Sequence, residues 1–414
     1  MATSNQTVAF FASFNEAIRI VMVGIVAILA ASYLLSSNRR AIQWRVVLWG
    51  LGLQGVVAAF VLRTDAGYRL LERISAGIVW FLQFSFHGAQ FVFGRLADPH
   101  GGFGILFAFQ VLPLIIFVAA CFSILYYFRV IPTLIELGGK LMFQIMRTSG
   151  AESLEVVASI VMDQTSAPLV IRPYLAGLTE SELLTVMTTG MAHISAAMLG
   201  AYVLLGAEAR DLLTAVVMTA PGAILISKML VPEVKIPATA SHARIDVREK
   251  SVNVLQAISR GVTDGLSLAL IVGAMLITFV ALIALTNGVL SIAHTSLESV
   301  FGYILGPVAW TLGVPWSDAR AVGSVMATKL VLNEFLAFSM LGPLKGHIAA
   351  RSFTVATYAI CGFSNFGSIG IQIGALGSLA PTRKADVARL GFRALLAGTF
   401  ANYLSAGIVG LLLR

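Results

Sequence analysis

The chain has 414 residues, of which 58% are hydrophobic and only 12% are charged. Soluble globular proteins have about 25% charged residues, so this composition excludes an ordinary soluble protein and indicates a protein built for lipid. The net charge of +8 does not indicate a nucleic-acid-binding protein, because the Lys and Arg residues lie in loops between apolar runs.

Eight apolar runs are long enough to be transmembrane helices, at about 20 residues a span. In chain order they cover 16–36, 46–62, 103–129, 181–206, 212–231, 264–286, 352–379 and 387–413. No basic segment or cleavage site precedes the first run, so we expect it to be a retained helix. Segment 63–102 mixes apolar and charged residues, which is typical of a helix in the membrane interface. We expect a second such segment at 288–316.

Basic residues follow the first, fifth and seventh runs, and they predict the orientation of the chain. In an eight-span count, all three of these loops fall on one side, which the positive-inside rule makes cytoplasmic. Both termini are then expected on the outer side of the membrane. The basic residues are Arg39, Arg40, Arg45, Lys228, Lys235, Arg244, Arg248, Lys250, Arg260, Arg383, Lys384, Arg389 and Arg393.

Two moderately apolar segments, 149–175 and 318–347, do not fit as spans, because each has polar residues at its centre and Pro or Gly nearby. Irregular backbone exposed to lipid is unfavourable, because each unpaired peptide group costs several kcal/mol there. Both segments are therefore predicted to be re-entrant hairpins buried in protein. The first enters from the cytoplasm and the second from outside.

Each hairpin is followed by a long apolar helix with a polar interruption, "TTGMAHISAAMLG" and "ICGFSNFGSIG", and then by one more span. The two interruptions align on Gly190 and Gly362. Such a unit, repeated once in opposite orientation, is typical of secondary transporters with a site in mid-membrane. The predicted fold is therefore an all-α polytopic membrane protein with about eight transmembrane helices, two opposed re-entrant hairpins, interfacial helices and an inverted repeat.

Asp163 and Glu334 are acids at the expected hairpin tips. An acid at the bilayer centre costs at least ~2.5–3.5 kcal/mol, so it normally faces a cavity or a partner and marks a pathway. The alternative is an ion pair with Lys329 or Arg172 that holds a hairpin shut. His193 lies inside a helix, either as an interhelical hydrogen-bond donor or as a titratable coupling residue.

No nucleophile elbow, phosphate loop, HExxH or Cys/His cluster is present, so the sequence predicts neither a cofactor nor an enzyme. Two alternatives stay open at this point. A channel would need a continuous polar path, and a membrane-embedded enzyme could use Asp163 and Glu334 as paired carboxylates for acid–base chemistry.

The motifs "DQTSAPLVIRPYL", "KLVLNEFLAF" and "CGFSNFGSIGIQIGALGSLAP" resemble those of the concentrative nucleoside transporters. The likeness extends over most of residues 100–414. The resemblance implies a symporter that imports nucleosides, or close C-riboside relatives, across the inner membrane. It also implies a homotrimer in which a transport domain moves like an elevator against a trimer scaffold.

The resemblance also implies four parts along the chain. Residues 1–130 form scaffold helices one to three with an interfacial helix. Residues 131–231 form the first transport repeat, which comprises the first hairpin, the broken fourth helix and the fifth helix. Residues 232–317 contain the cytoplasmic loop, the sixth scaffold helix and an interfacial segment, and residues 318–414 form the second transport repeat.

The sugar half of the implied site keeps the family's residues, Glu334, Asn365 and Ser368. A carboxylate suits a vicinal diol because it is purely an acceptor, and a sugar that lacks those hydroxyls would leave the buried acid unpaired. A sugar requirement is therefore expected. Helix ends exposed by the breaks would supply further donors.

The resemblance assigns the base half of the site to Gln164, Thr165 and Phe363. Ser166 stands where the family has Glu, and Met198 is bulkier than the usual small aliphatic residue at that position. These departures leave the preference for purine, pyrimidine or C-riboside open.

Three further departures from the family's pattern bear on the coupling ion. Ser159 and His193 stand where sodium-coupled members have Asn and Ser, and Asp163 replaces a Gly. Sodium prefers hard oxygen ligands, which an imidazole replaces poorly. We therefore expect proton coupling, with His193 or Asp163 binding the proton. The alternative is sodium held by Ser159, Met162, His193 and Ile194.

Overall fold

The computed structural model describes residues 2–98, 106–240 and 251–413, and within them the chain forms α-helices and short 3-10 helices but no strand. Seven helices of this part are long and apolar enough to cross a membrane, or eight if one pair bent by 116° counts as a single span. The predicted all-α polytopic fold is therefore confirmed.

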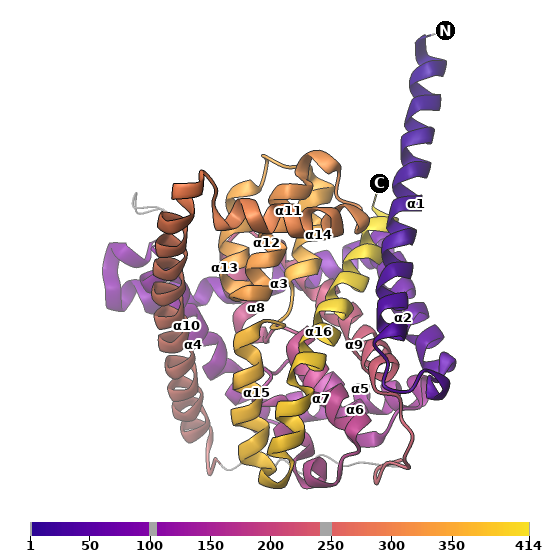
Figure 1. The fold of residues 1–414 in the computed structure, drawn as a ribbon. Helices are drawn as coiled ribbons and strands as arrows, with labels where there is room; N and C mark the ends of the chain where they lie inside the picture. The colour runs from indigo at the N-terminus through magenta and orange to yellow at the C-terminus, as the bar shows by residue number, and fades with distance from the viewer. Residues whose placement is uncertain (1, 99–105, 241–250, 414) are drawn as a thin grey trace.

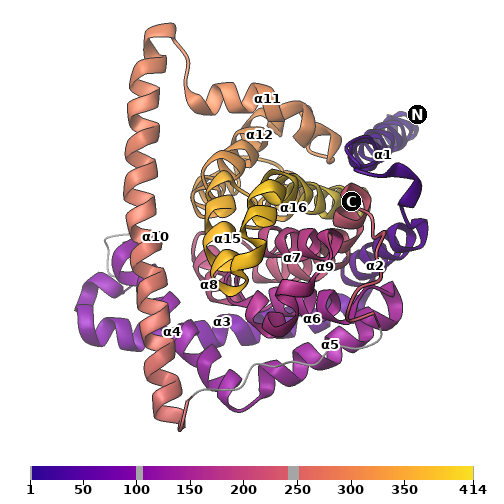
Figure 2. The ribbon, with the colours of Figure 1, turned by 60° about the horizontal axis from the view of Figure 1, so that its bottom comes forward.

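The N-terminal part contains α1 (Ala2–Leu34), α2 (Trp44–Arg63), α3 (Asp65–Phe93) and α4 (Phe107–Tyr127). Helices α1, α2 and α4 correspond to the first three predicted spans. The length and composition of α3 would also suit a span. However, α3 lies across the direction of the long helix α10 (Val254–Leu290) in Figures 1 and 2, as expected for an interfacial helix.

Helix α5 (Val130–Met146) is an element that the sequence analysis did not predict. It has only 17 residues, so it is too short for an ordinary span. Ile131 and Ile135 are buried, whereas Leu134 and Leu137 are exposed. Its buried side packs against the next helix and so joins the N-terminal part to the first hairpin.

The first hairpin consists of α6 (Gly150–Ser159), a turn, and the 3-10 helix η3 (Ala167–Gly177). It is followed by the broken helix α7 (Glu180–Ala192) and α8 (Ala196–Leu204), and then by α9 (Ala209–Leu230). Capping boxes begin both α6 and α7, because Ser149 pairs with Glu152 and Thr179 with Glu182.

The second half of the chain repeats this order after α10 and α11 (Leu297–Thr311), which lies in the segment predicted to be interfacial. The second hairpin consists of α12 (Trp316–Val331) and α13 (Glu334–Leu341). The broken helix is α14 (Ala350–Ile360) and α15 (Phe366–Leu379), and α16 (Lys384–Leu412) completes the repeat.

The two hairpins enter the molecule from opposite ends, as the inverted repeat predicts. Figure 1 shows the hairpin α12–α13 at the upper end, where α1 begins and α16 ends. Helix α6, the α15–α16 turn and the segment that follows α9 lie at the lower end, and the last two belong to the predicted cytoplasmic loops. Arg244, Arg248 and Lys250 lie outside the described residues.

A buried ionic network ties the lower ends of α6, α7 and α9 together. The Lys228 ammonium contacts the carboxylate of Glu152, lies 3.5 Å from that of Glu233, and donates a hydrogen bond to Ser181 (2.9 Å). Because Lys228 and Glu152 are both buried, neither charge can turn to water when its partner is removed. This network therefore holds the first hairpin to the two helices behind it.

We expect the change Lys228→Met to lower the free energy of unfolding by about 3–5 kcal/mol, because it leaves the Glu152 carboxylate buried without a cation. The change Arg260→Met removes the exposed pair Arg260–Asp264 (3.9 Å) and should cost no more than about 1 kcal/mol. Denaturant unfolding of both variants in detergent measures the difference, and equal losses would contradict a structural role for the network.

Candidate functional site

The two helix breaks, one in each repeat, lie against each other. The first break runs from His193 to Ser195, and the second from Cys361 to Asn365. The backbone N–H of Phe363 donates to the carbonyl of His193 at 3.2 Å and so joins the breaks directly. The interruptions read from the sequence therefore converge on one place.

Asn402, on α16, joins the same two breaks through its side chain. Its amide nitrogen donates to the carbonyl of Ala192 at 2.8 Å and to that of Cys361 at 3.0 Å. Gly362 permits this approach, because a Cβ atom there would lie 2.5 Å from both the Ala192 carbonyl oxygen and Asn402 Oδ1. One buried amide thus pairs two peptide carbonyls that the breaks leave free.

Side chains at the far end of each break begin the next helix. The Ser195 hydroxyl accepts a hydrogen bond from Met198 N–H (3.3 Å), and Asn365 Oδ1 accepts one from Ser368 N–H (2.9 Å). These side chains are N-caps buried in the interior of the protein. They also place the positive ends of the α8 and α15 dipoles beside the polar cluster.

Glu334 is the centre of a polar cluster with Tyr202 and Asn365, called the sugar-side cluster after the predicted role of Glu334 and Asn365. Its carboxylate accepts hydrogen bonds from the Tyr202 hydroxyl at 3.0 Å and from the Asn365 amide at 3.3 Å. Glu334 and Asn365 are buried, and Tyr202 is stacked on Phe338 with ring centroids 4.4 Å apart. The structure therefore brings together the two predicted residues Glu334 and Asn365, and it adds Tyr202, which the sequence analysis did not select.

Gln164 connects the first hairpin to this cluster. Its amide nitrogen donates to the Ser368 hydroxyl at 3.1 Å, while its amide oxygen is buried without a hydrogen-bond partner among the described residues. A Cβ atom on Gly190 would lie only 3.1 Å from Gln164 Cβ, so glycine lets the hairpin approach α7. The free amide oxygen can accept a hydrogen bond from a bound solute.

The remaining residues of the hairpin turn form a closed unit. The Asp163 carboxylate accepts hydrogen bonds from the backbone N–H of Thr165 (2.8 Å) and Ser166 (2.9 Å). It also accepts them from the hydroxyls of Thr165 (2.5 Å) and Ser166 (3.1 Å). In this conformation, the three side chains therefore stabilise the turn rather than reach toward Glu334.

Met198 lies in the first turn of α8, directly after the first break, and Phe363 lies in the second break. Met198 is buried and Phe363 is half-buried. Both are apolar side chains beside the polar cluster, which suits the predicted contact with the flat faces of a base.

A second polar cluster lies on the other side of the first break and contains a residue that the sequence analysis missed. Glu155, on α6, is 0% exposed. Its carboxyl group contacts the hydroxyls of Ser159 (2.8 Å) and Thr189 (2.5 Å). His193 Nδ1 lies 2.8 Å from the Thr189 carbonyl oxygen, so Ser159, Glu155, Thr189 and His193 form one connected group. The i, i+4 spacing of Glu155 and Ser159 was the available signal.

The positions considered for sodium converge only in part. Ser159 and His193 belong to the Glu155 cluster, whereas Met162 lies in the hairpin turn and Ile194 is a buried residue of the first break. The backbone carbonyl of Val161, the residue before Met162, already accepts a hydrogen bond from the Ala196 N–H at 3.3 Å. No group of three or more His, Cys, Asp or Glu side chains suited to a metal ion occurs in the described part of the chain.

The alternative ion pairs across the hairpins are not formed. Arg172 is exposed on η3. Lys329 donates instead to the Ser364 hydroxyl and to Asn402 Oδ1 (3.2 Å), and no carboxylate lies within ion-pair distance of it among the described residues. Neither Asp163 nor Glu334 is therefore neutralised by a basic side chain at contact distance.

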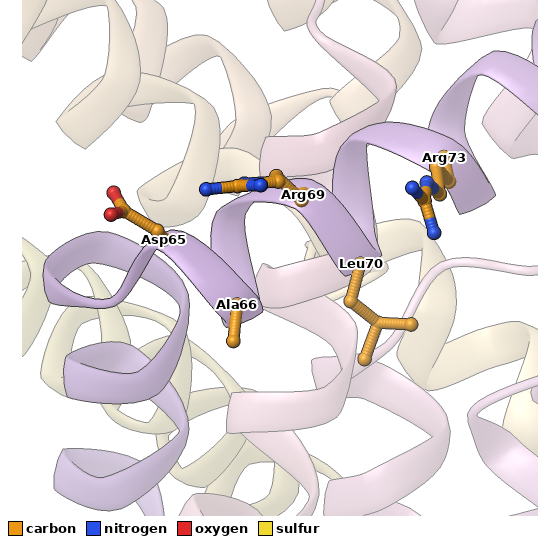
Figure 3. A pocket seen from close by; sticks show the side chains of 5 residues that line it. All are labelled: Asp65, Ala66, Arg69, Leu70 and Arg73. Carbon is orange, nitrogen blue, oxygen red and sulfur yellow. The ribbon is translucent and has the colours of Figure 1, made fainter.

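Two surface hollows lie apart from these clusters. One, of about 490 Å³, lies at the start of α3 and is lined by Asp65, Ala66, Arg69, Leu70 and Arg73 (Figure 3). The other, of about 810 Å³, lies between α3, α9 and the segment after the second hairpin, where Lys345 pairs with Glu208 at 2.5 Å. Charged and apolar side chains alternate along the first hollow, as expected for an interfacial helix.

Comparisons with known proteins match nearly the whole chain. Family profiles described as "Na+ dependent nucleoside transporter N-terminus", "Nucleoside recognition" and "Na+ dependent nucleoside transporter C-terminus" match residues 23–96, 108–209 and 211–410. The uncharacterized transporter YutK of Bacillus subtilis is 40% identical, over 94% of this chain and 98% of that protein. The nucleoside permease NupC of Helicobacter pylori is 37% identical, over 94% and 96%.

Solved structures of similar proteins have the same fold as this chain. CNTnw in an inward-facing substrate-bound state matches with a TM-score of 0.91 and 37% identity, over 95% of this chain and 99% of that one. A CNTnw variant in an outward-facing state matches with a TM-score of 0.92 and 36% identity, over 96% and 99%. The fold is therefore that of a protein observed open to both sides of the membrane.

The change Asn402→Ala should lower the free energy of unfolding by roughly 2–5 kcal/mol, because it leaves two buried carbonyl groups unpaired at about 1–3 kcal/mol each. The control is Thr399→Val, three residues earlier on α16, whose hydroxyl donates to the Leu395 carbonyl of its own helix (2.9 Å) and to no other helix among the described residues. Unfolding of both variants in detergent gives the comparison. A loss no greater than that of the control would show that Asn402 does not join the breaks.

Proposed function

Because the chain belongs to the concentrative nucleoside transporter family, and is a membrane transporter of nucleosides rather than an enzyme, we propose that it is a proton-coupled symporter. In this proposal it carries nucleosides into the cytoplasm across a bacterial inner membrane, with both termini in the periplasm. Alternating access is supported by the likeness to both inward- and outward-facing structures.

The sugar-side cluster is the proposed ribose site. The Glu334 carboxylate can accept hydrogen bonds from two neighbouring hydroxyls, and its present donors, Tyr202 and Asn365, hold it in place. Gln164 offers an unpaired amide oxygen to the base, and Phe363 and Met198 offer apolar surface. Thr165 and Ser166 would reach the solute only after the turn closed by Asp163 rearranges.

The connection between the breaks supports an elevator movement. Since Asn402 bonds carbonyls of both broken helices, residues 131–231 and 318–414 would move together as the transport part. Residues 1–130 and 232–317 would form the scaffold. In the apolar window of α10 only 6% of the residues are buried. This leaves a long apolar helix available for the proposed homotrimer contacts and for lipid.

Proton coupling rests on one observation, which is that Glu155 is fully buried with two hydroxyl partners and no cation. An uncompensated buried carboxylate costs several kcal/mol, so the group is stable only when it is protonated or paired with an ion. Its direct contacts with the Ser159 and Thr189 hydroxyls leave no space between these oxygens for a sodium ion, whereas a proton needs none.

Thr189 allows the proton to be bound and released without moving heavy atoms. Its hydroxyl lies 2.5 Å from Glu155 Oε2, 2.9 Å from the Thr185 carbonyl oxygen and 3.0 Å from that of Val186. A hydroxyl has one proton but can also accept. It therefore donates to the carboxylate when Glu155 is charged. It donates to a carbonyl, and accepts from Glu155, when Glu155 is protonated.

The surroundings of Glu155 supply no fixed countercharge among the described residues. Lys228 is engaged by Glu152, Arg210 by Asp211, and Lys140 and Arg172 are exposed. The other titratable groups on α6 and on the elements packed against it are Glu152, Glu136, Tyr174, Glu180, Glu182, Asp211 and His193. His193 is the one that joins the cluster, through Thr189. We therefore assign the coupling proton to Glu155 with His193 as its neighbour, in preference to Asp163.

Sodium coupling is the second candidate. The oxygen atoms of Glu155, Ser159 and Thr189 are hard ligands of the kind that sodium prefers. If hairpin movement separated them, they could hold that ion together with backbone carbonyls near Met162 and Ile194. The matching family profiles are described as sodium dependent. Replacement of sodium by choline, with and without an imposed pH gradient, separates the two ions.

Reconstituted protein should accumulate labelled uridine or adenosine in vesicles when an inward proton gradient is imposed, and a protonophore should abolish the accumulation. The change Glu334→Gln should reduce uptake at least tenfold, because one acceptor of the proposed diol pair becomes a donor. Glu208→Gln, at an exposed acid paired with Lys345, is the matched control. Wild-type uptake by Glu334→Gln would refute the site assignment.

The change Glu155→Gln should separate binding from coupling. A permanently neutral amide mimics the protonated acid, so the variant should still exchange nucleoside across the membrane but should no longer accumulate it. Its exchange should lose the pH dependence of the wild type. Glu180→Gln, at a partly exposed acid paired with Arg389 at the surface (2.9 Å), should keep both. Proton-driven accumulation by Glu155→Gln would exclude Glu155 as the proton carrier.

A further inference from the structure

Lys329 is a buried cation that neither the sugar site nor the proton site uses. It lies near the end of α12, in the first limb of the second hairpin, and is 0% exposed. Its ammonium donates to the Ser364 hydroxyl and to Asn402 Oδ1 at 3.2 Å, both neutral acceptors. Burial of an ammonium without a carboxylate at contact distance is costly, so packing alone does not account for a lysine here.

Lys329 holds the position in the second hairpin that corresponds to Ser159 in the first. Ser159 lies five residues before Gln164 in the first hairpin, and Lys329 lies five residues before Glu334 in the second. Each side chain is near the end of its first limb. Ser159 contacts the carboxyl group of the proton site, which reaches the first break through Thr189 and His193. Lys329 contacts Ser364 of the second break directly.

The contacts of Lys329 lead to both breaks and to the sugar site. Asn402, which accepts from Lys329 through its oxygen, donates through its nitrogen to Ala192 and Cys361. Ser364 precedes Asn365, whose amide donates to Glu334. The second hairpin therefore contacts two adjacent residues of the second break. Its Lys329 ammonium contacts Ser364, and its Glu334 carboxylate contacts Asn365.

We propose that the Lys329 ammonium is a tethered cation that permanently occupies, in the second repeat, the place where the first repeat binds its exchangeable ion. In that place it orients Asn402 and Ser364 and so positions Asn365 and Glu334 for the solute. Lys329 is a positioning residue and touches no solute. Its effect on affinity rests on the proposed nucleoside site, but its effect on the empty protein does not.

The test is chemical rescue. The change Lys329→Ala removes four side-chain atoms, and propylammonium supplies three carbons and an ammonium of the same size. We expect at least tenfold weaker binding of labelled uridine or adenosine to the purified variant, with most of the affinity restored by millimolar propylammonium. The neutral analogue 1-propanol fills the same space without charge and should not restore it.

The matched control is Lys329→Met, which keeps the side-chain volume but removes the charge. It should bind nucleoside as weakly as Lys329→Ala, and propylammonium should not rescue it because the space is filled. A second readout needs no nucleoside. The unfolding temperature of solute-free Lys329→Ala should rise with propylammonium and not with 1-propanol, while that of Lys329→Met should respond to neither.

Three results would overturn the proposal. These are wild-type affinity in Lys329→Met, rescue of a folded Lys329→Ala by 1-propanol as effectively as by propylammonium, and no rescue by either compound. If Lys329→Ala does not fold, the affinity of Lys329→Met decides the question. A wild-type protein that binds no nucleoside would refute the proposed function instead, and the unfolding temperatures would still test the tethered cation.

Discussion

The whole arrangement depends on peptide groups that lose their helical partners in the middle of a membrane. Two helices break there, and lipid offers no hydrogen bonds to replace those that the breaks remove. Asn402 satisfies carbonyls of both breaks, the Phe363 N–H pairs with the His193 carbonyl, and Ser195 and Asn365 cap the helices that follow. The polar site exists because these groups must be paired inside protein, where a polar solute can also be accommodated.

Much of this arrangement could be predicted from the sequence, because polar residues in apolar runs have few structural explanations. The two helix breaks were predicted and are present, and the structure brings Glu334 to Asn365 and Gln164 to Ser368, which are residues that the sequence assigned to one site. Patterns within one segment, together with three motifs in order, carry this information.

Other features could not be predicted because they depend on partners distant in the chain. An acid in a short helix, such as Glu155, gives no distinctive signal in the sequence. Only the three-dimensional structure shows that its side chain is buried against Thr189 without a cation. Lys329 was considered only as the alternative partner of a hairpin acid, and the structure places it against Ser364 and Asn402 instead. Helix α5 was missed because a short half-apolar segment matches neither a span nor a loop.

Glu155 and Ser159 lie on α6, whereas Glu334 and Asn365 belong to the second hairpin and break. The proposed ion site and the proposed ribose acceptors are therefore encoded in different repeats of the gene. Changes of ion dependence can thus arise in evolution through substitutions on α6 and α7 that leave Glu334 and Asn365 unchanged.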